Sequence, residues 1–188
     1  MPKYSKNDVR LQKEITYLNA DIDNLLANQM LMIKSEQMSL NPELELTIPV
    51  LSEAIQKNKT TIKKIVGNGK LFFYFDEHYC SLCYKEIIEK VNQYVNSQGS
   101  ETINIIANFS NLRNFVFFLK NTEIKVPVYY ISESVNIIAT EANQPFFFVL
   151  DSDLKVRSCY IPDKKYNKNV EEYITSTSNY LKGNTSSH

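Results

Sequence analysis

The stretch "KLFFYFDEHYCSLCYKEIIEKV", residues 70–91, decides the fold of this chain. After Lys70, residues 71–75 form a continuous apolar run, which indicates a strand buried on both faces. From Tyr84 onward, apolar residues recur at the three- and four-residue steps of an amphipathic helix. Cys80 and Cys83 stand where the strand pattern gives way to the helix pattern. The stretch therefore predicts a strand, a short turn and a helix, with two cysteines at the turn.

The placement of the two cysteines indicates redox chemistry. The first turn of a helix has unpaired N–H groups and a partial positive charge, and both favour a thiolate at Cys80. Cys83 lies three residues along on the same face, so it can attack a mixed disulfide formed at Cys80. We expect Cys80 at the exposed tip to be the attacking thiol. Cys83, expected to be more buried, would be the resolving thiol.

The cysteine pair has three other interpretations. A zinc site needs two more ligands, and the candidates are the distant Cys159, His78 and the tail residue His188, so no metal site is expected. A peroxidase typically has a hydroxyl three residues before its reactive cysteine. Here that position is Glu77, whose charge would repel a thiolate. Two packing cysteines without a redox role stay open as an alternative.

Composition narrows the functional class further. The 188 residues carry 21 basic and 21 acidic side chains with no basic stripe, which argues against a nucleic-acid partner. No apolar run approaches the roughly 20 residues of a membrane span, and residues 1–10 lack the apolar centre of a signal peptide. The chain is expected either to be cytosolic or to begin after a removed signal or anchor. Cys159, in a late strand pattern, is expected to be a buried bystander.

The remainder of the chain alternates between strand and helix patterns. After the cysteine segment and its helix come a second buried strand, a second helix and a short strand. A strand hairpin, with a turn at Asp151–Asp153, and a closing helix follow. This order predicts a mixed sheet covered on both faces. The expected strands are 102–109, 126–132 and the hairpin 145–162, and the expected helices are 84–95, 111–121 and 167–181.

The N-terminal segment predicts one long helix. It has no Gly or Pro, and its apolar residues fall at coiled-coil spacing, with Ile at a positions and Leu at d positions. One reading is a homodimer that pairs through residues 8–33. The other is a helix docked on its own domain, which Leu26 and Ile33 favour because they widen the stripe beyond a strict seam. The stripe comprises Leu11, Ile15, Leu18, Ile22, Leu25 and Met32.

Two motifs together resemble the thioredoxin superfamily. The segment "LFFYFDEHYCSLCYKEII" resembles its strand, aromatic residue, C-x-x-C and helix, and "NQPFFFVLDSD" resembles its cis-proline strand, with Pro145 as the cis residue. Over residues 45–181 the pattern is similar to small thioredoxin-like lipoproteins of Bacteroidetes and to membrane-anchored reductases of bacterial envelopes. The resemblance implies an α/β fold, a thioredoxin-like mixed β-sheet flanked by helices, after a long N-terminal amphipathic helix. The expected boundaries are 1–40 for a helical extension, 41–182 for the thioredoxin-like domain and 183–188 for a disordered tail.

The resemblance also implies a function. A thiol-disulfide oxidoreductase of this type, expected to be a reductase, needs no cofactor and acts on a protein substrate with a cysteine pair or disulfide. The upstream electron donor is not indicated by the sequence. We expect a periplasmic or cell-envelope location, with a membrane anchor in the full-length protein. The residues implied to contact substrate are Tyr79, Ser81, Leu82, the backbone of Gln144, and Pro145.

The chain departs from thioredoxin at two places. Ser81-Leu82 replaces Gly-Pro between the cysteines, so the redox potential is not transferable. Tyr74 occupies the position of thioredoxin's buried acid and is a poor base at neutral pH. Asp76, Glu77 or His78 is a candidate for proton transfer in its place, and transfer through water is the other alternative. These departures keep one alternative open: a non-catalytic interaction module that dimerises or docks a partner through its N-terminal helix.

Overall fold

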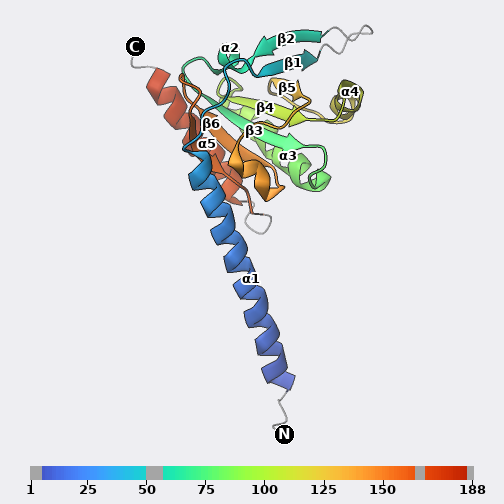
Figure 1. Ribbon diagram of the computed structural model, residues 1–188, viewed down its shortest axis with the longest axis vertical. Helices are drawn as coiled ribbons and strands as arrows, with labels where there is room; N and C mark the ends of the chain where they lie inside the picture. The colour runs from blue at the N-terminus through green and yellow to red at the C-terminus, as the bar shows by residue number, and fades with distance from the viewer. Residues whose placement is uncertain (1–5, 50–56, 164–167, 186–188) are drawn as a thin grey trace.

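A computed structural model describes residues 6–49, 57–163 and 168–185 (Figure 1). The strands form a single mixed sheet in the order β2-β1-β5-β4-β3-β6-β7, so the predicted thioredoxin-like α/β fold is confirmed. The predictions for residues 52–56, a strand or turn, and for the end of the tail at 186–188 lie outside the described residues. The strands are β1 (Glu45–Pro49), β2 (Lys57–Thr61), β3 (Lys70–Asp76), β4 (Ile103–Asn108), β5 (Val128–Ile131), β6 (Phe146–Leu150) and β7 (Val156–Tyr160).

Strand β3 positions the cysteine pair because it leads directly into the turn that carries Cys80. It pairs in parallel with β4 and antiparallel with β6, so Tyr74 lies between Ile106 and Phe146. Residues 71–75 have no solvent exposure, which confirms the prediction of a strand buried on both faces. The carboxyl end of β3 therefore lies beside the start of β6, which follows Pro145.

Helices cover both faces of the sheet, as predicted. Phe73 and Phe75 face a core shared with helices α3, α4 and α5, whereas Phe72 and Tyr74 face a second core closed by α2, the 3-10 helix η1 and the end of α1. Helix α5 continues to Thr185, where the sequence predicted a disordered tail from residue 183. The covering elements are α2 (Ile62–Val66), α3 (Ser81–Gln98), α4 (Leu112–Lys120), η1 (Ile138–Ala142) and α5 (Lys168–Thr185).

Helix α1 (Lys6–Ser35) extends away from the domain, and its N-terminal end lies far from the sheet (Figure 1). Its other end is anchored on η1 and β7. The Ser35 hydroxyl accepts a hydrogen bond from the Ala139 backbone N–H at 2.9 Å, and the Met32 sulfur accepts one from the Ile161 N–H at 3.2 Å. The helix is thus fixed by its last two turns.

The apolar stripe of α1 faces solvent. Leu11, Ile15, Leu18, Ile22 and Leu25 are each 42–57% exposed. The prediction that this stripe docks on the chain's own domain therefore holds for Met32, which packs on the core, and is wrong for Leu11 to Leu25. The physical reason is that α1 projects beyond the domain, so residues 7–20 are exposed on every face of the helix.

Candidate active site

The cysteine pair lies at the junction between β3 and α3. Cys80 and Cys83 are joined as a disulfide, with their Cα atoms 5.2 Å apart. Cys80 is exposed and occupies the N-cap position of α3, while Cys83 is half-buried in the first turn. The Cys83 N–H donates to the Cys80 carbonyl at 3.0 Å, which closes this turn. A disulfide so placed presents its Cys80 sulfur to solvent.

The electrostatics of the turn favour a thiolate at Cys80 once the disulfide is reduced. An N-cap side chain lies beside the unpaired N–H groups of the first helical turn and near the positive end of the helix dipole. No Asp or Glu occupies the first turn of α3, so within that turn no carboxylate opposes the effect. The arrangement can therefore generate a nucleophilic sulfur at an exposed position.

Aromatic packing beneath α3 holds the turn in place. Phe75 is the last apolar residue of β3. Its ring stacks on the ring of Tyr84, with the two centroids 4.4 Å apart. Phe118 of α4 packs edge-on against Phe75 at 5.4 Å and against Tyr84 at 5.9 Å. Because all three rings are buried, the first turn of α3 rests on a close-packed support.

Tyr79, one residue before Cys80, links the turn to η1. Its hydroxyl donates to the Thr140 carbonyl at 3.3 Å, and its ring meets Tyr74 edge-on at 6.4 Å. Burial raises the pKa of Tyr79, so its hydroxyl stays protonated and remains a donor at neutral pH. Tyr79 thereby holds the cysteine turn against the segment that leads to Pro145. The two residues between the cysteines, Ser81 and Leu82, are both exposed.

His78 belongs to a polar cluster around Asp76. Its ring Nδ1 lies 2.7 Å from the Asp76 carboxylate, which also accepts a hydrogen bond from the Asn108 amide at 2.8 Å. The hydrogen bond to Asp76 raises the pKa of His78 above its ordinary value. A protonated His78 would place a positive charge two residues before Cys80.

Glu77 is tied to the start of α4. Its carboxylate accepts a hydrogen bond from the Ser110 backbone N–H at 2.5 Å, and the Asn114 amide lies 3.5 Å from it. Burial pushes the pKa of Glu77 upward, but the hydrogen bonds from Ser110 and Asn114 outweigh it and leave the pKa below its ordinary value. Glu77 is therefore ionised at neutral pH and steadies the turn.

Tyr74 is a buried neutral phenol at the position that the motif resemblance aligns with thioredoxin's buried acid. Its hydroxyl lies 3.3 Å from the Ser134 hydroxyl and receives the Asn108 amide at 3.4 Å. Burial raises the pKa of Tyr74, so it does not act as a base at neutral pH. Proton transfer at this turn therefore depends on another group or on water.

Pro145 lies at the start of β6, beside the end of β3, but the bond that precedes it is trans, as are all the peptide bonds that the structure describes. The prediction of a cis bond is wrong. Asn143, the residue that ends η1, adopts the left-handed conformation (φ 51°). The trans form is favoured by about 0.5–1 kcal/mol before proline. Gln144 is half-buried, and Pro145 is buried.

Two groups of the site were not predicted. Asn108 ends β4, and its side-chain amide donates hydrogen bonds to Asp76 and Tyr74. The sequence contains a signal for this contact, because Asp76 and Asn108 end neighbouring parallel strands. The Thr140 carbonyl belongs to η1, a five-residue element too short to leave a periodic signal.

Comparisons with known proteins establish the fold. No protein-family model matches the chain, and no curated protein matches it. A solved structure described as a candidate thiol:disulfide interchange protein DsbE from Chlorobium tepidum superposes with a TM-score of 0.50 and 11% identity, covering 74% of this chain and 96% of its own. A candidate thiol-disulfide oxidoreductase from Bacteroides vulgatus (TM-score 0.47, 13% identity, 73% and 98% covered) and the mitochondrial 2-cys peroxiredoxin of Plasmodium falciparum (TM-score 0.48, 15% identity, 80% and 98% covered) are also similar.

Proposed function

We propose that this protein is a thiol-disulfide oxidoreductase that acts on disulfides of other proteins, with Cys80 as the attacking thiol and Cys83 as the resolving thiol. One observation carries the proposal: a disulfide-bonded pair occupies the exposed N-terminus of α3 in a thioredoxin-like fold. A thiolate there is stabilised by the helix, is open to solvent and has its partner sulfur within bonding distance.

In the reducing direction, which we favour, the exchange balances as follows. The Cys80 thiolate attacks one sulfur of the substrate disulfide, so a mixed disulfide forms and the other substrate sulfur leaves as a thiolate that takes up a proton. The Cys83 thiol loses its proton and attacks the Cys80 sulfur. The Cys80–Cys83 disulfide then forms and the second substrate thiol is released. Two electrons pass to the substrate, and a dithiol donor must later reduce the pair.

The proposed contact surface surrounds the exposed sulfur. Leu82, 78% exposed, offers an apolar contact beside Cys80, and Tyr79 and Ser81 flank the sulfur in sequence. Gln144 and Pro145 would supply the edge along which the substrate backbone lies, as in β-strand addition. For proton movement, His78 is the better supported candidate because it is exposed, whereas the hydrogen bonds of Glu77 go to Ser110 and Asn114.

A location in the periplasm or cell envelope, with a membrane anchor in the full-length protein, is part of the proposal and rests on the motif resemblance. No helix in the described part of the chain has the length and apolar character needed to cross a bilayer. Fractionation of cells that express the gene from its natural start tests the location. We expect the protein in the envelope fraction, and recovery in the cytosol alone would contradict it.

The catalytic proposal is tested by the reduction of insulin with dithiothreitol. We expect wild-type protein to accelerate the reaction and Cys80→Ser to give the rate without protein. Cys159→Ser is the matched control and should retain the acceleration, because Cys159 is buried and free. Wild-type protein that is no faster than Cys80→Ser would overturn the catalytic reading.

A second function is favoured by the exposed stripe of α1. Five stripe residues at a and d spacing lie open on a helix whose own domain does not cover them. We infer that this stripe, within residues 8–33, pairs with the same stripe of a second copy. Ile at a and Leu at d favour a parallel two-stranded coiled coil. Pairing would remove the exposed apolar side chains of the projecting turns from water and so stabilise them.

Sedimentation of the full chain at micromolar concentration tests the pairing. Wild-type protein should be a dimer, and Ile22→Glu, which places a charge in the seam, should be a monomer. Lys13→Glu places the same carboxylate on the opposite face of the helix, with a larger change in net charge, and should still leave the dimer intact. A monomeric wild-type protein contradicts this inference without bearing on the cysteine chemistry.

A further inference from the structure

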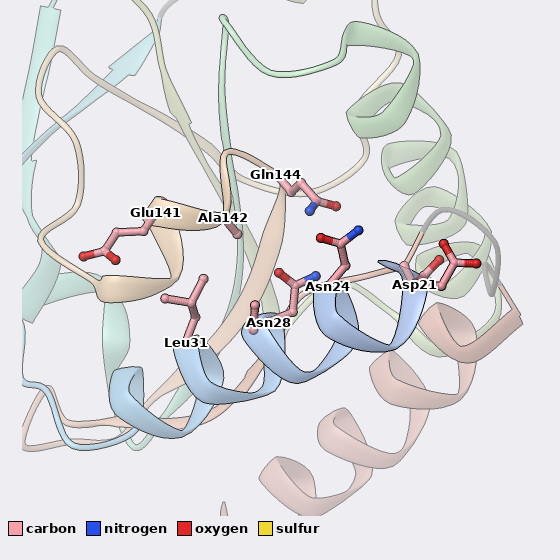
Figure 2. A pocket seen from close by; sticks show the side chains of 9 residues that line it. Asp21, Asn24, Asn28, Leu31, Glu141, Ala142 and Gln144 are labelled. Atoms are coloured by element: carbon pink, nitrogen blue, oxygen red, sulfur yellow. The ribbon is translucent and has the colours of Figure 1, made fainter. Parts of the chain in front are cut away.

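A polar groove of about 510 Å³ lies between α1 and the segment that leads to Pro145 (Figure 2). One wall is α1, which contributes Asn24, Asn28 and Leu31. The other wall is formed by Glu141, Ala142 and Gln144. Figure 2 shows the side chains of Asn24 and Gln144 pointing toward one another across it. The groove therefore combines a residue beside the proposed substrate edge with side chains of the N-terminal helix.

The groove is linked to the cysteine turn through η1. The Tyr79 hydroxyl bonds to Thr140, which directly precedes Glu141 in η1, and Tyr79 directly precedes Cys80. On the other side, Phe146 pairs with Tyr74, which places the start of β6 at the end of β3 that leads into the turn. A polypeptide whose cysteine contacts Cys80 would thus find Gln144 and then the α1 wall along its path.

Helix α1 presents different chemistry on its two faces. Asn24 and Asn28 each follow a stripe residue, Leu18 and Ile22 respectively, by six positions, which corresponds to about 120° around the helix axis. The amide face is therefore turned to the groove while the apolar stripe is turned to solvent.

The chemistry of this wall suits a polypeptide backbone. Each Asn or Gln side chain carries an N–H₂ donor and a carbonyl acceptor, the same pair of groups that a peptide unit presents. Three such amides, Asn24, Asn28 and Gln144, line one groove together with the carboxylates of Asp21, Glu141 and Asp163, which accept hydrogen bonds from backbone N–H groups. A small disulfide without peptide units would reach Cys80 but would gain nothing from them.

We propose that α1 forms the second wall of the substrate cleft and that Asn24 and Asn28 hydrogen-bond the backbone of the segment that flanks the substrate cysteine. This inference rests on the proposed oxidoreductase function and names its substrate class as extended polypeptide segments, in preference to small disulfides. Asn24 and Asn28 are then specificity-determining residues outside the thioredoxin-like domain.

The test compares two disulfides in reactions of the prereduced full-length protein. Insulin carries its disulfides within polypeptide chains, and hydroxyethyl disulfide has no peptide unit. For the double variant Asn24→Ala/Asn28→Ala we expect the second-order rate constant with insulin to fall about tenfold, the effect of losing two hydrogen bonds of ordinary strength. The rate constant with hydroxyethyl disulfide should stay at the wild-type value.

A matched control is available on the same helix. Asn19→Ala/Gln29→Ala removes two amides from exposed positions that do not line the groove, and both rate constants should be unchanged. An unchanged insulin rate in the groove variant overturns the inference, as does an equal fall with both disulfides, which would show a general structural effect. Wild-type protein that reacts with hydroxyethyl disulfide but never with insulin would overturn the proposed function itself.

Discussion

Cys80 and Cys159 show how one side-chain type takes two roles in the same chain. Cys80 is exposed at the N-cap of α3, bonded to Cys83, with no carboxylate in the first helical turn. Cys159 is buried and free in β7, where its backbone N–H donates to Glu36 at 2.9 Å. Burial raises the pKa of the Cys159 thiol to about 12. Both residues carry a thiol, so solvent access and position at a helix terminus are what distinguish the reactive thiol from the buried one.

The largest effect expected from this contrast is in alkylation of the reduced protein. From the ordinary thiol pKa of 9.0 to a pKa of about 12, the thiolate fraction of Cys159 falls by about a thousandfold. Iodoacetamide should therefore modify Cys80 and Cys83 at least a hundredfold faster than Cys159, as followed by peptide mass spectrometry. In concentrated urea the three rates should converge. Equal rates in the folded protein would contradict the contrast.

The aromatic support beneath the cysteine turn offers the next test. Phe75 is fully buried and stacks on Tyr84, so Phe75→Ala should lower the free energy of unfolding by about 3–5 kcal/mol, measured by urea denaturation. Phe117→Ala is the matched control on α4, because its ring is 70% exposed. It should change stability by less than about 0.5 kcal/mol. Similar losses in both variants would show that the turn does not depend on this packing.

The smallest expected effect concerns Glu77 and pH. Its pKa in the folded protein lies below the ordinary value of 4.5, so its contribution to stability is present above that value and is lost as pH falls through the folded pKa. Glu77→Gln should cost about 1 kcal/mol of unfolding free energy at neutral pH, because a hydrogen bond to a charged acceptor is lost. The difference from wild type should shrink at pH below the folded pKa.

The control for this experiment is Glu89→Gln, which removes an exposed carboxylate from α3. Its stability should follow wild type across the pH range. A difference between wild type and Glu77→Gln that persists unchanged in acid would show that the carboxylate charge is not what steadies the turn.

The sequence predicted a mixed sheet covered on both faces because its strands are strong signals, and the thioredoxin-like assignment came from the resemblance of the cysteine and Pro145 motifs. Residues 71–75 form an uninterrupted apolar run, and burial on both faces is the usual reason for such a run. The buried state of Cys159 was also predicted correctly. The element η1 was not predicted, since five residues of 3-10 helix have no periodicity to detect.

Two features depended on tertiary structure that local patterns do not contain. Periodicity identified the stripe of α1 but not how much of it is covered, because only the end of the helix, at Met32 and Ser35, contacts the domain and the earlier turns project beyond it. The bond before Pro145 is trans and Asn143 is left-handed, and neither conformation was indicated by the resemblance. The groove with its amide wall is formed by α1 and residues 141–144, so it too depends on tertiary structure.

The central claim is that Cys80 attacks protein disulfides and Cys83 resolves the product. Trapping tests it most directly: reduced Cys83→Ser and reduced Cys80→Ser are each mixed with insulin, quenched with acid and analysed by intact-mass spectrometry. The account predicts a persistent mixed disulfide at Cys80 in Cys83→Ser and little or none in Cys80→Ser. Faster or more abundant adduct formation in Cys80→Ser would contradict it.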